Sequence, residues 1–293
     1  MRWWGVLNPS AGDAGDVRER VRGALASARV EADLWISESD DHLRAIVDEG
    51  LEAGAEGFIA IGGDGTVSLV ADALLRRHPP EPPLLGVIPS GSGCDFIRVF
   101  GIAQDVEAAA QHLAGSETYL ADAAVVEGAW GRRHFVNAAD LGVIGATVKR
   151  AAGFPRRLGR MRYLTAFWTV LPFFGSTGVT ISMERRTYEG RAIAIVLANG
   201  QFFGSGLNIA PKATLVDGVL DVQVFTGTRW SAIPIVPRVR RGLHLGHPSV
   251  TRFRSGKLRI DADRPWPIEV DGDYLGETPV DVTVLPRALR IKI

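Results

Sequence analysis

Residues 58–70 read "FIAIGGDGTVSLV", and this stretch decides the fold class of the 293-residue chain. A short apolar run ends at Gly62 and Gly63, and Asp64, Gly65 and Thr66 follow before apolar residues resume. Such a pattern is typical of a strand that turns into a helix. Glycines let the backbone approach an anion closely, and the N–H groups of the first helical turn point toward it. The stretch predicts a phosphate-binding loop, although similar glycine-rich turns also occur without a ligand.

The first 125 residues repeat this order of strand and helix. Short apolar segments predict strands at 2–8, 30–37, 57–63 and 83–89. Amphipathic segments predict helices at 16–28, 40–54, 66–77 and 105–115. Strands that alternate with helices form a parallel sheet with helices on both faces. We therefore expect a nucleotide-binding α/β domain over residues 1–125.

The rest of the chain is dominated by short strand-like runs separated by turn residues. They lie at 134–142, 178–185, 191–200, 218–225, 257–262, 267–275, 279–286 and 288–293. This texture predicts an all-β antiparallel sandwich over residues 126–293. Because ligand sites are common where domains meet, we expect the active site in the cleft between the two domains.

Composition limits the classes of protein to consider. A single cysteine, Cys94, excludes a disulfide framework and indicates a reducing compartment. The N-terminus lacks the apolar segment of a signal peptide, and no apolar run reaches the roughly 18 residues that a spanning helix needs. We therefore expect a cytoplasmic protein.

Charge is unevenly distributed although the formal net charge is zero. Residues 1–140 hold 22 acidic and 11 basic residues, and the remainder holds 11 acidic and 22 basic residues. Two stretches, 141–183 and 222–260, contain no acidic residue. Basic patches of this kind attract nucleic acid or an anionic membrane, and the alternative is a solvated basic face.

A second glycine-rich loop, "PSGSGCDF" (89–96), follows the predicted strand 83–89. Two such loops at neighbouring strands suit a polyphosphate better than one. Asp64 next to a phosphate would be repelled unless a cation lies between them, and Mg²⁺ is the natural candidate. The alternative role for Asp64 is to cap the following helix. The P-loop, the dinucleotide fingerprint and the serine-hydrolase elbow are all missing from the sequence.

Taken together, these motifs resemble the diacylglycerol kinase catalytic domain family, which includes bacterial lipid kinases, sphingosine kinases and ceramide kinases. The matching motifs, in order, are "NPSAG" (8–12), "GGDGTVS" (62–68), "PSGSGCDF" (89–96), "FVNAADLG" (135–142), "NGQFFGSGLNIAPKATLVDGVLDV" (199–222) and "VDGDYLGETP" (270–279). The resemblance covers essentially the whole chain. It implies an NAD kinase/phosphofructokinase-like first domain and transfer of the γ-phosphate of Mg-ATP to a lipid hydroxyl, with diacylglycerol as the leading substrate and phosphatidic acid as the product.

The resemblance also assigns roles to individual residues. Those expected to bind ATP are Asn8, Pro9, Ser10, Gly12, Ser37, Gly62, Gly63, Asp64, Gly65, Thr66, Val67, Ser68, Gly91 and Ser92. Asp271 matches the general base, and Asp64 is expected to assist as a second catalytic carboxylate. Asp217 matches a structural Mg²⁺ site that is completed by backbone carbonyls of Thr214 and Val219. From spacing alone, Asp271 would read as an ordinary hairpin turn, and Asp217 would read as a plain turn.

Three residues depart from the family pattern, and the changes at Cys94 and Asp273 leave room for a protein that has lost turnover. Ser92 stands where the family has Thr, Cys94 stands where it has Asn, and Asp273 stands where it has Glu. The alternatives are an NAD kinase-like small-molecule kinase and a nucleotide- or lipid-binding regulator that has lost turnover.

The expected partners are a lipid substrate and an anionic membrane surface, bound peripherally, and no nucleic acid. The basic and aromatic segment 149–175 is a candidate for the membrane surface, and the alternative is a core helix with snorkelling arginines. Exposed edge strands could also pair in a homodimer.

Overall fold

The computed structural model describes residues 1–8, 14–90, 94–155, 158–159, 161–204 and 206–293. The chain divides into two compact units. The first unit comprises Met1–Ala123 together with Pro286–Ile293, and the second comprises Ala124–Leu285. Residues Pro286–Ile293 thus return to the first unit, whereas the sequence predicted a single boundary near residue 125.

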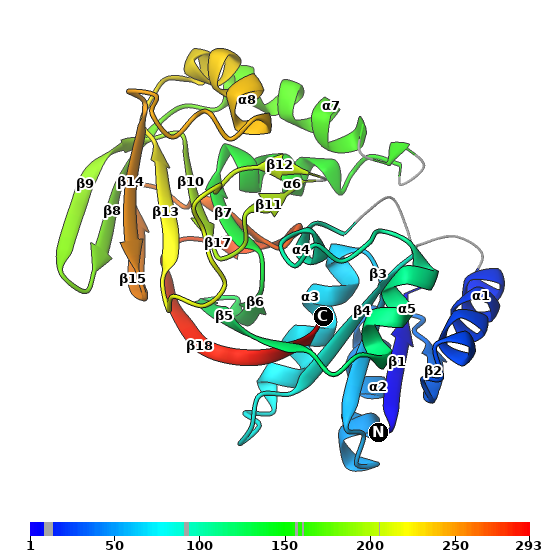
Figure 1. The fold of residues 1–293 in the computed structure, drawn as a ribbon. Helices are drawn as coiled ribbons and strands as arrows, with labels where there is room; N and C mark the ends of the chain where they lie inside the picture. Colours follow the sequence, from blue (N-terminus) through cyan, green and yellow to red (C-terminus); the bar gives the residue numbers. More distant parts are fainter. Residues whose placement is uncertain (9–13, 91–93, 156–157, 160, 205) are drawn as a thin grey trace. The chain divides into compact units, whose positions relative to one another are not determined.

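The first unit is built on a parallel sheet with the strand order β2-β1-β3-β4-β18 (Figure 1). Its strands are β1 (Trp3–Leu7), β2 (Ala32–Ile36), β3 (Gly57–Gly62), β4 (Leu84–Pro89) and the end of β18 (Val280–Lys292). Its helices are α1 (Ala14–Ser27), α2 (Asp40–Glu52), α3 (Asp64–Arg76), α4 (Asp95–Arg98) and α5 (Val106–Ala114). The predicted α/β fold of this half is confirmed.

Two adjacent tryptophans show that both faces of this sheet are covered. Trp3 and Trp4 are buried and, as neighbours on one strand, point to opposite faces. Trp4 donates its indole N–H to the carbonyl of Ile46 in α2 (2.9 Å). On the other face, Trp3 and Leu113 of α5 both lie against Gly86 of β4. Close helix contact on both faces explains why these strands are almost entirely apolar.

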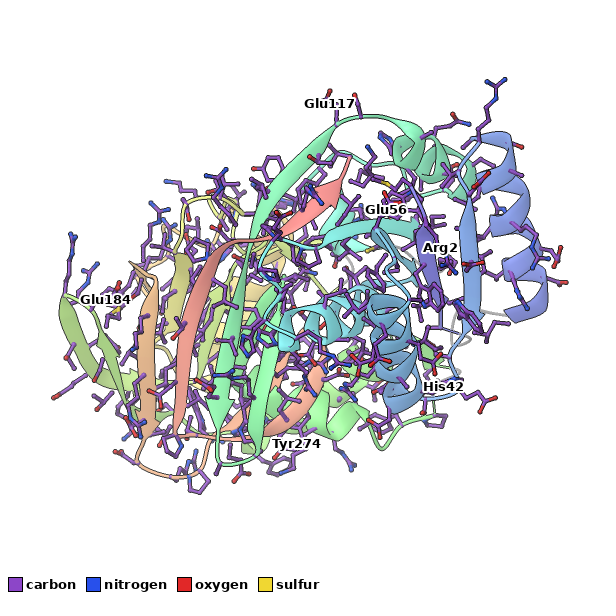
Figure 2. The ribbon with its side chains drawn as sticks, turned by 90° about the horizontal axis from the view of Figure 1, so that it is seen from below. Arg2, His42, Glu56, Glu117, Glu184 and Tyr274 are labelled. Atoms are coloured by element: carbon purple, nitrogen blue, oxygen red, sulfur yellow. The ribbon has the colours of Figure 1, made fainter. Side chains whose placement is uncertain are left out.

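Hydrogen bonds join strand ends at the periphery of the first unit. The amide of Arg2 donates to Glu56 Oε1 (3.2 Å) and joins the start of β1 to the start of β3 (Figure 2). Asp122, on β5 (Thr118–Gly128), is buried and accepts the N–H of Arg287 from β18 (2.7 Å). Asp122 therefore holds the returning C-terminal strand in place.

The second unit is an antiparallel sandwich, as predicted. One sheet has the order β14-β13-β10-β7-β16-β17. In the other, β15 pairs with β18 and β8, β8 pairs with β9, and β5 pairs with β6 and β18. The strands are β6 (Gly131–Phe135), β7 (Ala138–Gly142), β8 (Thr177–Met183), β9 (Arg186–Ala192), β10 (Ala194–Ala198), β13 (Leu220–Phe225), β14 (Val250–Ser255), β15 (Lys257–Ala262), β16 (Pro267–Val270) and β17 (Asp273–Glu277). An apolar core that includes Phe135, Leu197 and Trp266 fills the space between the two sheets.

Helices cover the outer face of the six-stranded sheet. They are α6 (Val143–Ala151), α7 (Met161–Val170), η3 (Leu171–Phe173), η4 (Arg229–Ser231) and α8 (Ala232–Arg240), and the short strands β11 (Phe202–Phe203) and β12 (Leu207–Asn208) accompany them. A second apolar cluster joins Leu171 and Ile235 to Val196 of β10. A helix was expected in this half only as an alternative for segment 149–175, where α7 is found, and neither α6 nor α8 was predicted.

A further difference concerns the segment 134–142, which was expected to form one strand. The structure breaks it into β6 and β7 at Val136 and Asn137. The two strands belong to different sheets, so the chain must cross between sheets at this point.

A substitution at Gly142, the last residue of β7, tests how tightly the chain is packed after it crosses between the sheets. Its φ is +82°, and a Cβ at this position would lie 2.5 Å from both the carbonyl oxygen of Ile193 and the ring of Trp266. We expect Gly142→Ala to lower the free energy of unfolding by about 1–3 kcal/mol more than Gly131→Ala. Gly131 has a φ of +117° but open space around it, so it isolates the cost of the clash. Equal losses for the two variants in urea unfolding would contradict this packing argument.

Candidate active site

The carboxyl ends of the parallel strands bring several predicted ATP-binding residues together. Ser37 N–H donates to the carbonyl of Leu7 (2.9 Å), and Asn8 N–H donates to the carbonyl of Ile61 (3.2 Å). Ser90 N–H donates to the carbonyl of Gly62 (3.2 Å). The ends of four neighbouring strands are thus joined at one edge of the sheet. This is where ligands bind in open α/β sheets.

Helix α3 begins directly at this edge, with Gly63 as its N-cap residue. A Cβ at Gly62 would collide with the Thr66 side chain, so the strand-to-helix turn needs glycine there. Thr66 and Ser68 are buried in the first turns of the helix. The N-terminus of a 13-residue helix carries a partial positive charge, which favours a phosphate at this position.

Asp64 connects the starts of α3 and α4. Its Oδ1 accepts the N–H of Phe96 (2.9 Å) and the thiol of Cys94 (3.4 Å). Burial raises the pKa of the Cys94 thiol well above its usual value, and the charge of Asp64 raises this pKa further. Cys94 is therefore a neutral hydrogen-bond donor and not a nucleophile. Gln104 braces the same turn through both the N–H and the carbonyl of Cys94 (2.8 and 2.9 Å).

Five predicted ATP-binding residues lie outside the described residues. They are Pro9, Ser10, Gly12, Gly91 and Ser92.

In the second unit, Asp271 occupies the turn between β16 and β17, with φ +47° at Asp271 and +94° at Gly272. Its Oδ1 accepts the N–H groups of Asn137 and Ala138 (both 3.0 Å), and its Oδ2 accepts the N–H of Val136 (3.1 Å). The Asp271 N–H returns to the carbonyl of Ala138 (2.9 Å). The break between β6 and β7 therefore holds both oxygens of this carboxylate in one orientation.

The segment around Asn199 supports this break from the other side. Asn199 Nδ2 donates to the carbonyl of Val136 (2.7 Å). The N–H groups of Asn199 and Gly200 both donate to the carbonyl of Asn137 (2.8 and 2.9 Å). Three segments that are far apart in sequence, at 135–142, 199–200 and 270–273, therefore form one hydrogen-bonded cluster.

Charged side chains border the Asp271 turn. Asp273 pairs with Arg133 (3.1 Å), which is buried, so the shorter acid at this position still finds a cation. Lys149 of α6 donates to the hydroxyl of Tyr274 (2.9 Å; Tyr274 is labelled in Figure 2) and lies 3.5 Å from Glu277.

Two buried acids lie next to this turn. Glu269 of β16 stands directly opposite Asp140 of β7, and both side chains are almost completely buried. Burial raises the pKa of Asp140 to about 7, and the charge of Asp271 adds to this shift, whereas the neighbouring Glu269 carboxyl opposes it. Burial and the Asp140 charge raise the pKa of Glu269 well above its usual range.

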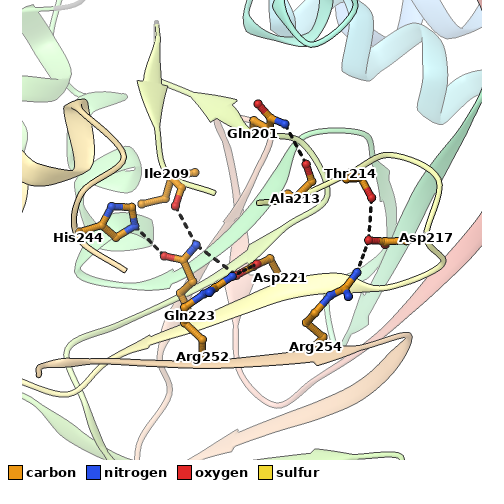
Figure 3. A network of polar contacts seen from close by, with 10 residues as sticks. All are labelled: Gln201, Ile209, Ala213, Thr214, Asp217, Asp221, Gln223, His244, Arg252 and Arg254. Atoms are coloured by element: carbon orange, nitrogen blue, oxygen red, sulfur yellow. Dashed lines mark hydrogen bonds and ion pairs between the residues drawn. The ribbon is translucent and has the colours of Figure 1, made fainter. Parts of the chain in front are cut away.

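The predicted metal residues have partners within the protein (Figure 3). Asp217 accepts the hydroxyl of Thr214 (2.7 Å) and the N–H of Val219 (3.2 Å), and it pairs with Arg254. Across the described part of the chain, no three His, Cys, Asp or Glu side chains gather as a metal site. Because Arg254 already neutralises Asp217, these residues as they stand do not fit a bound Mg²⁺.

A neighbouring network in Figure 3 is structural. Arg252 pairs with buried Asp221 (2.5 Å), and His244 contacts Gln223 (2.9 Å). Burial lowers the pKa of His244, so its ring is neutral.

Two family descriptions match the chain, one over each half. The diacylglycerol kinase catalytic domain matches residues 2–126. The YegS C-terminal NAD kinase beta sandwich-like domain matches residues 138–293. The chain belongs to the YegS and diacylglycerol kinase family. The family predicted from the sequence motifs is thereby confirmed.

Relatives in this family extend over nearly the whole chain. A "Probable lipid kinase YegS-like" of Xanthomonas oryzae pv. oryzae (strain MAFF 311018) is 27% identical over 99% of this chain and 96% of its own length. A protein of the same name from Enterobacter sp. (strain 638) is 28% identical over 94% of this chain and 88% of its own length. The solved structure of a diacylglycerol kinase from Bacillus anthracis str. Sterne has a TM-score of 0.75 at 20% identity and covers 99% of this chain and 96% of its own. This structural likeness shows a shared fold.

Sequence reasoning missed Asp140, Glu269, Arg133 and Gln104. Glu269 alternates with Ile268 and Val270, which face the sandwich core, so strand alternation predicts only that Glu269 points away from this core. Nothing in the sequence of β16 indicates that helix α6 covers the face of the sheet on which Glu269 lies.

The Asp217 site gives a direct test of metal dependence. We expect the wild-type unfolding midpoint to be the same in millimolar Mg²⁺ and in EDTA, because Arg254 already occupies the carboxylate. In Arg254→Ser, Asp217 loses this cation, and we expect added Mg²⁺ to stabilise the variant by roughly 1 kcal/mol or more. A wild-type midpoint that rises with Mg²⁺ would instead support the metal assignment. The measurement is thermal unfolding without nucleotide.

Proposed function

We propose that this protein is an ATP-dependent lipid kinase that transfers the γ-phosphate of ATP to a lipid hydroxyl, with diacylglycerol as substrate and phosphatidic acid as product. The observation that carries the proposal is the fixed carboxylate of Asp271. Three backbone N–H groups orient it, at the position that matches the base of the family.

The first unit supplies the site for the nucleotide. The phosphates would lie on the turn Gly62–Gly65 at the N-terminus of α3, with Asn8 and Ser37 at the ends of the neighbouring strands. Asp64 is half-buried at this edge, and its carboxylate is the group that would hold a hard cation such as Mg²⁺ here. When bound, Mg²⁺ would neutralise charge on the phosphates.

The second unit supplies the base. Asp271 accepts the proton as the O–H bond of the lipid hydroxyl breaks and the new O–P bond forms. The bond between the β- and γ-phosphates breaks at the same time, and ADP leaves with that electron pair. Transfer requires that both sets of residues act on one ATP–lipid pair.

The substitution Asp271→Asn tests the role of the base. We expect loss of transfer by about 10²-fold or more, because the amide cannot accept the proton, while ATP binding is retained. The measurements are radiolabel transfer from ATP and nucleotide titration. Asp263→Asn is the matched control, since Asp263 is another carboxylate of this unit that accepts a backbone N–H (Gly178, 3.1 Å). Retained turnover in Asp271→Asn would remove Asp271 from this role.

The acceptor is identified with the wild-type protein. Diacylglycerol, sphingosine, ceramide, phosphatidylglycerol and NAD are each offered with Mg-ATP. Transfer to diacylglycerol supports the proposal, whereas transfer to NAD alone supports a small-molecule kinase. ATP or lipid binding without transfer to any acceptor supports a regulator that has lost turnover.

We also propose that the protein binds anionic membranes peripherally. The surface concerned is the outer side of α7, η3, η4 and α8, here called the helical cap. Its exposed apolar side chains are Met161, Leu164, Trp168, Phe173, Trp230, Ile233 and Val236. Arg229 donates to the carbonyl of Pro172 (2.6 Å), so the two helical segments lie together.

Charge on the helical cap suits an anionic surface. Arg238, Arg240 and Arg241 are exposed at the end of α8, and the sequence over 141–183 and 222–260 contains no acidic residue. Exposed aromatic side chains flanked by arginines are typical of a surface that enters the lipid headgroups. None of the helices that the structure describes is long and apolar enough to span a bilayer.

Vesicle sedimentation tests the helical cap. We expect binding to vesicles that contain phosphatidylglycerol, weaker binding at high salt, and a loss of about tenfold in Phe173→Ala/Trp230→Ala. Phe173 is 88% and Trp230 is 61% exposed, so both substitutions should leave the fold intact. Arg240→Ser/Arg241→Ser is compared with Arg185→Ser, at the tip of the β8–β9 hairpin. Equal binding to neutral and anionic vesicles, or no effect of the cap variants, would contradict the proposal.

A further inference from the structure

The buried acids Asp140 and Glu269 lie behind the Asp271 turn, and the reaction scheme above does not use them. They form a directly opposed pair on adjacent antiparallel strands, β7 and β16. Asp140 is 0% and Glu269 is 3% exposed. Two ionised carboxylates in such a place would repel each other in a region that water cannot screen.

The described surroundings of Asp140 provide no hydrogen-bond donor, so one of the two acids must carry a proton to act as one. Both oxygens of Asp140 are buried, and among the described residues no N–H or O–H group donates to them. The carboxyl of Glu269, directly opposite on β16, is the group that can do so. A carboxylate accepts hydrogen bonds only, so Glu269 can serve as this donor only while it is protonated.

The other oxygen of Glu269 reaches the catalytic turn. Glu269 Oε2 accepts the N–H of Gly272 at 2.7 Å. Gly272 follows Asp271 directly, and both residues have positive φ. A protonated Glu269 can therefore donate to Asp140 on one side and accept from the turn on the other.

We propose that Asp140 and Glu269 share one proton, and that this singly protonated pair positions the Asp271 turn for catalysis. The positioning role rests on the proposed function of Asp271. The pair acts through the turn and touches no reacting atom in this scheme.

Among the described residues, no cation contributes to the raised pKa of either acid as an alternative to the proton. The cross-strand neighbours in the same row are Val196 on β10 and Tyr274 on β17. The buried residues of α6 are Val143, Gly145, Thr147 and Ala151, none of which titrates. Lys149 of α6 is directed to Tyr274 and Glu277, and Arg133 pairs with Asp273. The negative charge of Asp271 raises the pKa values of both acids further.

The shared proton makes the stability of the protein depend on pH. Carboxyls with a raised pKa stay protonated in the folded state at pH values where the unfolded chain has lost those protons. Their contribution to stability is therefore fully present at acidic pH and decreases as the pH rises from about 4 through about 7 and beyond.

The variant Glu269→Gln tests proton sharing without any assay of activity. Its amide can donate to Asp140 and still accept from Gly272, so it mimics the protonated state at every pH. We expect its Tm to gain on wild type by about 4 °C or more between about pH 5 and about pH 8. Infrared spectra at about pH 8 should show a protonated carboxyl band in wild type that is missing in the variant. Parallel Tm curves with an unchanged band would overturn proton sharing, whether or not the protein is a kinase.

A matched control shows whether the pH-dependent gain in Tm is specific to Glu269 or follows from replacing any buried acid. Asp221 is 3% exposed on the same sheet but faces Arg252. Asp221→Asn breaks an ion pair, so we expect a lower Tm than wild type at both pH values. A pH-dependent gain like that of Glu269→Gln would contradict the assignment of the shared proton to Asp140 and Glu269.

Positioning is tested with Glu269→Leu and its conservative partner. Glu269→Leu removes the acceptor for Gly272, and we expect faster hydrogen exchange at this amide and a fall in kcat of about 10²-fold with little change in the KM for ATP. Glu269→Gln should keep slow exchange, retain kcat near neutral pH and hold it at higher pH than wild type does. If Glu269→Leu does not fold, the pH dependence of kcat in Glu269→Gln is used as the test. A pH profile identical to that of wild type would overturn the positioning role of Glu269. If wild type phosphorylates nothing, the proposed function fails, while the exchange at Gly272 still tests how the turn is held.

Discussion

The arrangement of the second unit depends on one interaction, the acceptance of three backbone N–H groups by the carboxylate of Asp271. These groups are exposed to the carboxylate only because the chain leaves one sheet after Phe135 and enters the other at Ala138. A continuous strand would have used the same N–H groups in its own ladder. The break in the strand, the positive φ at Asp271 and the bracing by Asn199 are therefore parts of one constraint.

Much of the first unit follows from local sequence patterns. The helices expected at 40–54 and 66–77 are found at Asp40–Glu52 and Asp64–Arg76, because their apolar periodicity matches the faces that they bury. The site residues Asn8, Ser37 and Gly62 come together because parallel strands end at the same edge. This part of the site can be predicted from strand order alone, although Asp64 also serves a local purpose by accepting the N–H of Phe96.

The site in the second unit could be named only through the family motifs. "VDGDY" looks like any hairpin turn, and what distinguishes it is the set of N–H groups that a segment more than 130 residues earlier provides. The burial of Asp140 and Glu269 could not be predicted from the sequence for a related reason. Strand alternation predicts which side chains share a face, but it does not reveal whether helix α6 later covers that face. Contacts of high sequence separation decide both cases.

Strand β18 has a consequence for how the chain acquires its structure. It begins in the sandwich, where Val280–Thr283 pair with β15, and it ends beside β4 with Arg290 and Ile291. The edge of β4 is therefore completed by residues that are synthesised after those of the sandwich. Until then β4 pairs with β3 alone and has one unpaired edge, so the final assembly of this parallel sheet must wait for the sandwich to be synthesised.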